Sequence, residues 1–479
     1  MQTNTTKAIG WKMLERFGVQ GGQFLLQVIL ARLLDPKHYG VLSLMIIFTT
    51  LATVFIQNGF NTSLIQNKDV DEDDYSSVFW VTLLAAITIY ILLFFSAPLI
   101  ATAYKMPEIV APFRVLALVL FPGAINSIQI AKVSRKIDFK KIFYSNIGAI
   151  IISGVVGIIM AYKGFGLWSL VAQYILNITI AAIIMFFCVK WKPKFVCNLK
   201  RVKVLFAFGW KLLVSGLIDT LYQDIRSLII GLKYNSSTLG FYNRGKQFPQ
   251  FLVNAINGAV QSVLLPTMAK EQDDKAKVKV MMRTSITLCS YIMFPIMAGL
   301  AGVATPLVKI LLTDKWLPCV PYLQIYCFTF AFYPVHTCNL QAINAMGRSD
   351  IFLKLEIIKK SYGLLALLTA LFFFDSPIAI AMTGVFTALL SCFVNASPNK
   401  KIVGYSYFEQ MKDILPSFIL AAIMFVCVLL AGTLNLNPYL LLILQVITGC
   451  IIYVSLSAIT KVKPFLFLLE TTKNKFQKV

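Results

Sequence analysis

Charge is scarce in this chain. Asp, Glu, Lys and Arg together make up 14% of its 479 residues, whereas an average soluble domain carries about 25%. Hydrophobic residues reach 58%, the mean hydropathy is +0.75, and no polar stretch is long enough to form a separate soluble domain. The composition therefore argues against a soluble protein and predicts an all-α integral membrane protein.

Histidine and clustered cysteine are also scarce. The chain has only His38 and His336, and its nine cysteines stand singly, without a Cys-x-x-Cys pair or a Cys/His cluster. This pattern argues against a structural zinc site or a disulfide framework. A GxxxxGK[ST] phosphate loop is absent as well, which argues against ATP hydrolysis by this chain. We therefore expect no metal ion and no cofactor.

Long apolar runs fill most of the chain. A helix needs about 20 apolar residues to cross a bilayer. The polar start, Met1 to Thr6, is not followed by a cleavage-site pattern, so we expect no removed signal peptide. The apolar runs predict about fourteen transmembrane helices, near 8–33, 40–63, 77–100, 111–131, 142–162, 167–189, 204–231, 248–267, 284–311, 321–346, 361–375, 377–397, 414–433 and 438–459.

Basic residues gather in alternate loops. Lys and Arg number 44 against 21 acidic residues, and they concentrate around 132–141, 190–203, 270–283 and 348–360. Cytoplasmic loops of membrane proteins are enriched in Lys and Arg, so these loops and both termini are predicted to face the cytoplasm. The net charge of +23 thus indicates orientation, with contact to anionic lipids as a second role, rather than binding to nucleic acid.

The first and seventh predicted helices repeat one pattern, opening with Gly10-Trp11-Lys12 and Gly209-Trp210-Lys211. Polar residues follow in both at spacings of 4, 4, 3 and 4, which place them on one helix face. The repeat predicts two six-helix bundles, 1–203 and 204–400, then two more helices and a basic tail in 401–479. Internal repeats around a central site are typical of secondary transporters. The two stripes are Lys12, Arg16, Gln20, Gln23 and Gln27, and Lys211, Ser215, Asp219, Tyr222 and Arg226.

The charges in the first stripe need compensation. A charged side chain near the bilayer centre costs roughly 2.5–3.5 kcal/mol, so it needs a partner or a water-filled cavity. Lys12, Glu15 and Arg16 lie at i, i+3 and i+4, so they either neutralise one another or leave Arg16 facing a substrate.

The seventh helix offers the same choice. Lys211 and Arg226 would attract a diphosphate, for which Arg has a bidentate geometry, or would pair with another helix. Asp219 lies near mid-helix and is, with Glu15, the candidate ion-coupling carboxylate.

Neutral amides form a third group. Gln250, Asn254, Asn257 and Gln261 follow spacings of 4, 3 and 4 on the eighth predicted helix. Such a row either binds a hydroxyl-rich ligand or joins neighbouring helices, and both interpretations stay open. Further polar residues at the ends of the second, fourth and tenth helices favour a wide polar lumen: Gln57, Asn58, Asn61, Asn126, Gln129, His336, Asn339, Gln341 and Asn344.

An acidic run precedes the third predicted helix. Lys68-Asp69-Val70-Asp71-Glu72-Asp73-Asp74 contains two Asp-x-Asp patterns, which hold a metal and a nucleotide-sugar in glycosyltransferases. No nucleotide-binding domain surrounds the run. Because acids at a helix N-terminus accept its backbone hydrogen bonds and complement its dipole, we predict a helix cap here.

Several stretches resemble one family. Ala31-Arg32-Leu33-Leu34-Asp35-Pro36 with Tyr39-Gly40 is similar to that family's ARLL-P-dFG motif, and NGFNTSLIQNKDVDEDDYSSVFW (58–80) to the stretch that follows it. KGFGLWSLVAQ (163–173), LGFYNRGKQFPQ (239–250) and VLLPTMAKEQDD (263–274) continue in the family's order. Over most of nine helices the chain resembles the Wzx-like lipopolysaccharide and O-antigen flippases, polysaccharide transporters of the multidrug/oligosaccharidyl-lipid/polysaccharide exporter superfamily.

The resemblance implies a V-shaped exporter fold of about fourteen helices that works by alternating access in a bacterial inner membrane. It implies a polyprenyl-diphosphate-linked oligosaccharide, of the undecaprenyl diphosphate kind, as substrate and a cationic central cavity that Arg16 and Arg226 fit. It implies no catalytic residue, because nothing is cleaved. Membrane lipids and polysaccharide-assembly proteins, such as a polymerase or a chain-length regulator, are the expected partners.

Two other functions compete with this one. A cation-coupled multidrug exporter of the same superfamily would favour an acidic lumen, whereas the predicted lumen is net basic. A membrane glycan ligase or polymerase would need a sizeable outer loop with catalytic residues, whereas the longest predicted outer loop, near 232–247, is short.

Overall fold

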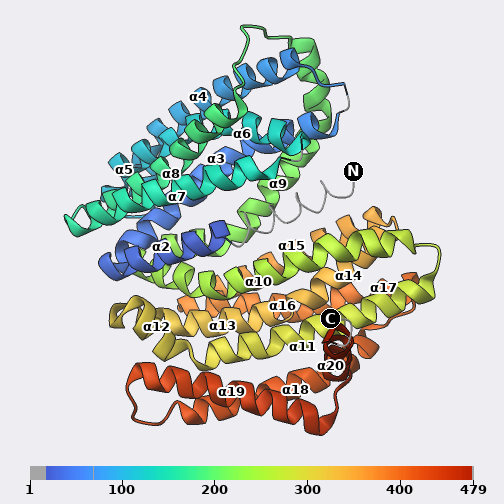
Figure 1. Cartoon of the computed structure of the whole chain (residues 1–479). Coiled ribbons are helices and arrows are strands. Elements are labelled where there is room, and N and C mark those ends of the chain that lie inside the picture. Colours follow the sequence, from blue (N-terminus) through green and yellow to red (C-terminus); the bar gives the residue numbers. More distant parts are fainter. Residues whose placement is uncertain (1–17, 68, 137, 477–479) are drawn as a thin grey trace. The chain divides into compact units, whose positions relative to one another are not determined.

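The computed structural model describes residues 18–476 except 68 and 137, and in this part of the chain the regular structure is helical throughout (Figure 1). The prediction of an all-α protein is thereby confirmed. The first helices are α2 (Gln20–Leu33), α3 (Pro36–Gln66), α4 (Glu72–Ala103), α5 (Val110–Leu116), α6 (Leu120–Arg135), α7 (Phe139–Tyr162), α8 (Leu167–Val189) and α9 (Leu199–Lys233). The later helices are α10 (Ser236–Lys270), α11 (Lys275–Gly302), α12 (Ala304–Leu312), α13 (Val320–Ala331), α14 (Tyr333–Ala345), α15 (Ser349–Phe373), α16 (Pro377–Ala396), α17 (Asn399–Ile402), α18 (Tyr407–Ala431), α19 (Pro438–Thr460) and α20 (Lys463–Phe476).

The described residues contain ten helical spans long and apolar enough to cross a membrane, or eleven if the bent α9 counts as one. The parts of α9 on either side of its bend, Leu199–Ala207 and Gly209–Lys233, meet at 54°. Among the other predicted spans, the first lies partly outside the described residues. The tenth is divided between α13 and α14, and the eleventh falls in the charged helix α15. The chain is a multi-pass membrane protein, and the count of fourteen is not confirmed.

The helices form two compact units, Met1–Asn243 and Arg244–Val479. The join lies inside α10, beyond the boundary at 203/204 that the repeat predicts. The assignment of 204–400 to a second six-helix bundle, and of 401–479 to an addition, stays a prediction. In the second unit α18 and α19 pack together and against α11. There the Tyr453 hydroxyl donates to the Tyr291 carbonyl at 2.7 Å.

An apolar cluster in the first unit joins the ends of four elements. Phe60 and Leu64 of α3, Val78 of α4, Ile128 of α6 and Val202 of α9 are all buried in it. Trp191, from the segment between α8 and α9, packs against the same cluster. The cluster therefore fixes the start of α9 and the α8–α9 linker (residues 190–198) against α4.

Two glycines allow α3 and α10 to cross at their first turns. A Cβ atom added to Gly40 would lie 1.7 Å from the carbonyl oxygen of Ser236, and one added to Gly240 would lie 2.2 Å from that of Pro36. The contact is reciprocal, because each glycine approaches a backbone carbonyl of the other helix. Only a residue without a side chain permits backbones to approach this closely.

Candidate functional site

The predicted substrate stripe of the first helix is described only in part. Lys12, Glu15 and Arg16 lie outside the described residues. Gln20 and Gln23 lie on α2, where both are partly buried. The two amides are therefore on a helix of the first unit, as predicted, and their role in binding stays a prediction.

The stripe of α9 lies on the longer part of that helix, beyond the bend. Lys211 and Asp219 are exposed and Arg226 is partly buried. All three lie within the segment Gly209–Lys233, which reaches a candidate membrane span only together with Leu199–Ala207. The charges of the stripe thus lie along one part of a bent helix, and their role in binding stays a prediction.

The amides of α10 belong to the second unit. Gln250 is partly buried, Asn254 is exposed and Asn257 is buried. The Oδ1 atom of Asn257 has no hydrogen-bond partner among the described residues. Because α2 and α9 belong to the first unit, a cavity shared by all three helices stays a prediction.

Other amides that favoured a polar lumen join helices. The Gln57 side chain donates to the Gly123 carbonyl at 3.3 Å, and the Ser127 hydroxyl donates to Asn61 at 2.8 Å. Both bonds connect α3 to α6. For these residues the helix-joining interpretation of polar side chains in membranes accounts for the contact.

The lumen prediction is wrong for Asn339, whose side chain is fully buried among α14, α17 and α18. Its Nδ2 donates to Gln410 at 2.8 Å, and its Oδ1 accepts from Gln410 at 3.0 Å and from Asn399 at 2.7 Å. A buried amide satisfied in this way specifies how helices pack. Spacing alone cannot tell it from an amide that faces water.

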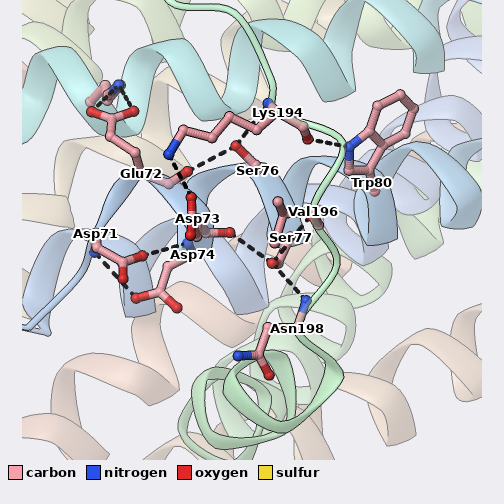
Figure 2. Close-up of polar contacts among 11 residues, drawn as sticks. Asp71, Glu72, Asp73, Asp74, Ser76, Ser77, Trp80, Lys194, Val196 and Asn198 are labelled. Carbon is pink, nitrogen blue, oxygen red and sulfur yellow. Dashed lines mark hydrogen bonds and ion pairs between the residues drawn. The ribbon is translucent and has the colours of Figure 1, made fainter.

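The acidic run caps α4, as predicted (Figure 2). The Asp71 side chain accepts from the backbone N–H of Asp74 at 2.7 Å, and the Asp74 side chain accepts from the N–H of Asp71 at 3.2 Å. This reciprocal capping box satisfies two N–H groups that the helix leaves open. Three acids in the first turn also complement the helix dipole.

The same acids also form ion pairs with bases from other elements, which the sequence did not show. Arg201 Nε and Nη2 donate to the two carboxylate oxygens of Asp74 at 2.9 and 2.6 Å, and the Asp74 side chain is only 2% exposed. Each acid of the first turn binds a base from another element: Glu72 binds Lys132 of α6, Asp73 binds Lys194 of the linker and Asp74 binds Arg201 of α9.

Neutral side chains complete the attachment of the linker to α4 (Figure 2). The Ser76 hydroxyl accepts from the backbone N–H of Lys194 at 3.1 Å, and that of Ser77 accepts from the N–H of Asn198 at 2.9 Å. The Trp80 indole donates to the Lys194 carbonyl at 2.8 Å. The hydrogen bond to Asp73 raises the pKa of the Lys194 ammonium, so this lysine stays charged at neutral pH.

These contacts join distant parts of the same chain. In the part of the chain that the structure describes, no group of three or more His, Cys, Asp and Glu side chains is placed to hold a metal ion. The acid run is a structural junction of α4, α6, the linker and α9. Its bases lie 60 to 127 positions away in the sequence, so no local pattern would have found them.

Comparison with known families gives a match over residues 29–321 to the family described as "Polysaccharide biosynthesis protein". The chain belongs to this family. Among curated relatives, it is 23% identical to the succinoglycan biosynthesis transport protein ExoT of Rhizobium meliloti over 418 residues, covering 86% of this chain and 81% of that one. It is 21% identical to the lipopolysaccharide biosynthesis protein WzxC of Escherichia coli over 361 residues, covering 75% and 73%.

Solved structures share the fold. The chain superposes on the lipid II flippase MurJ, in an inward closed conformation, with a TM-score of 0.73 and 16% identity. The match covers 94% of this chain and 98% of the MurJ chain. An inward-facing multidrug resistance MATE transporter matches 87% and 98%, with a TM-score of 0.60 and 12% identity. The fold is therefore the exporter fold that the sequence resemblance implies.

Proposed function

We propose that this protein is a transporter that flips polyprenyl-diphosphate-linked saccharides from the cytoplasmic to the outer leaflet of a bacterial inner membrane, for the assembly of a cell-surface polysaccharide. One observation carries the proposal: a member of a polysaccharide biosynthesis family has the fold of a lipid II flippase. Curated relatives named for succinoglycan transport and lipopolysaccharide biosynthesis support the same class of substrate. Both termini face the cytoplasm in this proposal.

The substrate's diphosphate is the part that most needs protein contacts. Its charge loses hydration on leaving water, and arginine offers it paired N–H donors. In this proposal Lys12, Arg16, Lys211 and Arg226 receive the diphosphate while the polyprenyl tail stays in lipid. The net basic character of the predicted lumen supports an anionic rather than a cationic cargo.

The saccharide needs hydrogen-bond partners of another kind. Amide side chains both donate to and accept from hydroxyls. We assign this role to Gln20 and Gln23 of α2 and to Gln250, Asn254 and Asn257 of α10. The exposure of Asn254 supports the assignment, whereas the Oδ1 atom of Asn257 is buried in this conformation and would have to become accessible to bind a hydroxyl.

The membrane potential supplies a driving force. Moving one charge across 100 mV is worth about 2.3 kcal/mol, so two negative charges moving outward gain about 4.6 kcal/mol. Asp219 and Glu15 are the carboxylates that would couple transport to an ion, if an ion gradient contributes. In this proposal the substrate site opens alternately to the cytoplasmic and the outer side of the membrane, which completes the cycle.

Proteoliposomes test the proposal. Purified protein is reconstituted with a labelled polyprenyl-diphosphate saccharide, and its outward movement under an imposed potential is compared with that of a cationic dye. We expect movement of the saccharide alone. Movement of the dye alone would assign the protein to the multidrug branch of the fold and would overturn the proposal.

Variants locate the phosphate contacts. Arg226→Gln and Lys211→Gln should each slow saccharide flipping at least about tenfold, because a hydrogen bond to a charged group is worth about 1.5–3 kcal/mol. Lys105→Gln and Lys163→Gln are the controls, since both lysines are exposed in short connections away from the stripes. Equal rates in all four variants would refute the cationic site.

A further inference from the structure

The α8–α9 linker and the start of α9 form a basic stretch that the proposed transport cycle leaves without a role. The linker follows α8, a candidate membrane span, and precedes the first part of α9. The linker therefore lies where the chain leaves the membrane. No acidic residue occurs between Val189 and Asp219, whereas seven basic residues do: Lys190, Lys192, Lys194, Lys200, Arg201, Lys203 and Lys211.

Two of these seven charges are neutralised within the described part of the protein and five are not. Lys194 pairs with Asp73, and Arg201 pairs with Asp74. Lys190, Lys192 and Lys200 are exposed, and none of them contacts a carboxylate in the described part of the chain. The two pairs hold the linker in place. The ammonium groups of Lys190 and Lys192 in the linker, and of Lys200 in the adjoining first turn of α9, are available to an external anion.

An aromatic pair lies beside these lysines. The Phe195 ring stacks on Trp80 with 5.2 Å between centroids and 24° between planes, yet Phe195 remains 93% exposed. The Trp80 indole N–H is bound to the linker carbonyl of Lys194 (Figure 2). Tryptophan collects at the head-group level of bilayers, where its apolar ring and polar N–H are both accommodated. An exposed phenylalanine stacked on such a tryptophan is suited to the same level.

We propose that the α8–α9 linker, together with the first turn of α9, is a docking surface for the anionic phospholipids of the surrounding bilayer. Lys190, Lys192 and Lys200 contact head-group phosphates, and Phe195 inserts among the acyl chains just below them. The partner is identified by charge and polarity together, because a phosphate layer above an apolar layer is what a leaflet of anionic lipid presents. The proposal is independent of the transported substrate.

The test uses a reporter inside the linker. Cys197 and Cys450 are the exposed ones among the nine cysteines. Cys450→Ala protein is labelled at Cys197 with an environment-sensitive fluorophore and placed in nanodiscs. Acyl-brominated lipid quenches the fluorophore on contact. The same mole fraction of brominated lipid is supplied either as phosphatidylglycerol or as phosphatidylcholine, and the two quenching strengths are compared.

We expect phosphatidylglycerol to quench several-fold more strongly. Each lysine near an anionic surface contributes about 1 kcal/mol of attraction, which corresponds to about a fivefold local enrichment of anionic over neutral lipid. Three lysines should therefore give a clear preference for phosphatidylglycerol, and this preference should fall at 1 M salt. The triple variant Lys190→Gln, Lys192→Gln, Lys200→Gln should bring the ratio well below the wild-type value. This variant keeps Lys194 and Arg201, so the attachment of the linker is preserved.

The matched control removes three exposed lysines elsewhere, Lys163→Gln, Lys400→Gln and Lys401→Gln, and should keep the wild-type ratio. Phe195→Ala should lower quenching by both lipids and leave their ratio unchanged. Equal quenching by the two lipids in the wild-type protein would overturn the proposal. A preference for phosphatidylglycerol that is undiminished in the triple variant would overturn it too, by assigning the selectivity to other residues.

Discussion

Replacing Gly40 with alanine should force α3 and α10 apart. The new methyl group would lie 1.7 Å from the Ser236 carbonyl oxygen, and real Cβ contacts essentially never fall below 3.0 Å. At least 1.3 Å of movement, the difference between these distances, is therefore required. The obstacle is backbone on both sides, so no side-chain rotation relieves it. Gly240→Ala is the mirror case, with 2.2 Å to the Pro36 carbonyl oxygen.

The loss of folding free energy caused by Gly40→Ala should lie at the upper end of the range known for overpacked cores. Extra methyl groups in a packed core cost about 1–3 kcal/mol when side chains adjust, and here helices must separate, so we expect about 3 kcal/mol for Gly40→Ala. In a unit of 243 residues that loss lowers the melting temperature by on the order of 10 °C if the unit unfolds cooperatively. Thermal unfolding of the purified protein in detergent, followed by intrinsic fluorescence, measures it.

The double variant provides the sharper test. Once α3 and α10 have separated to admit one methyl group, the second needs less room, so Gly40→Ala with Gly240→Ala should cost clearly less than the two single changes added together. Gly21→Ala is the control, because a Cβ there meets nothing within 4 Å. A helical alanine should leave stability unchanged or raise it by up to about 1 kcal/mol. Additive losses, or a Gly40→Ala protein as stable as Gly21→Ala, would refute the reasoning.

Two further changes probe the buried polar contacts. Asp74→Asn should destabilise the first unit by about 1–2 kcal/mol, because it breaks the two-point contact with Arg201, which is itself 42% exposed and so remains partly hydrated; thermal unfolding measures the loss. Asn339→Leu should cost about 2–3 kcal/mol, because the buried Oε1 of Gln410 loses its donor and Asn399 loses one of its acceptors, and the same assay applies.

Each of these predictions has its own control. Glu72→Gln alters an acid of the same helix turn whose side chain is 54% exposed, so its effect should stay below about 1 kcal/mol. If Glu72→Gln lost as much stability as Asp74→Asn, the burial of an acid would not determine how much its ion pair stabilises the junction. For Asn339→Leu, adding Gln410→Leu should recover part of the lost stability, because both amides of the pair are then gone. A double variant that is less stable by the full sum would contradict this account.

Helix positions were predictable because lipid imposes a simple rule. Any segment that crosses the bilayer must pair its backbone internally and carry about 20 apolar residues, so the runs behind α3, α4, α7, α8, α16, α18 and α19 mark helices directly. The rule weakens where other demands act. The run near 321–346 is broken around Phe332 and Pro334. Helix α15 carries Asp350, Lys354 and Glu356 in its first turns, so hydropathy alone does not mark it as a span.

The polar sites were predictable only as residue types. Spacing puts Asn339 and Asn257 on helix faces alike, but whether a face meets another helix or water depends on the tertiary packing. The acid run shows the same limit. Its cap is a local contact and was predicted, whereas its pairs with Lys132, Lys194 and Arg201 join distant parts of the chain.

The join between the two units has a practical consequence. Asn243 and Arg244 are consecutive residues of α10, so no loop at this point offers a protease an extended, accessible chain. The next break in the helix is the turn at 271–274, already within the second unit. Limited proteolysis should therefore not release the two halves intact. Coexpression of separate halves, split at 271–274, would leave residues 244–270 of the second unit on the fragment that carries the first.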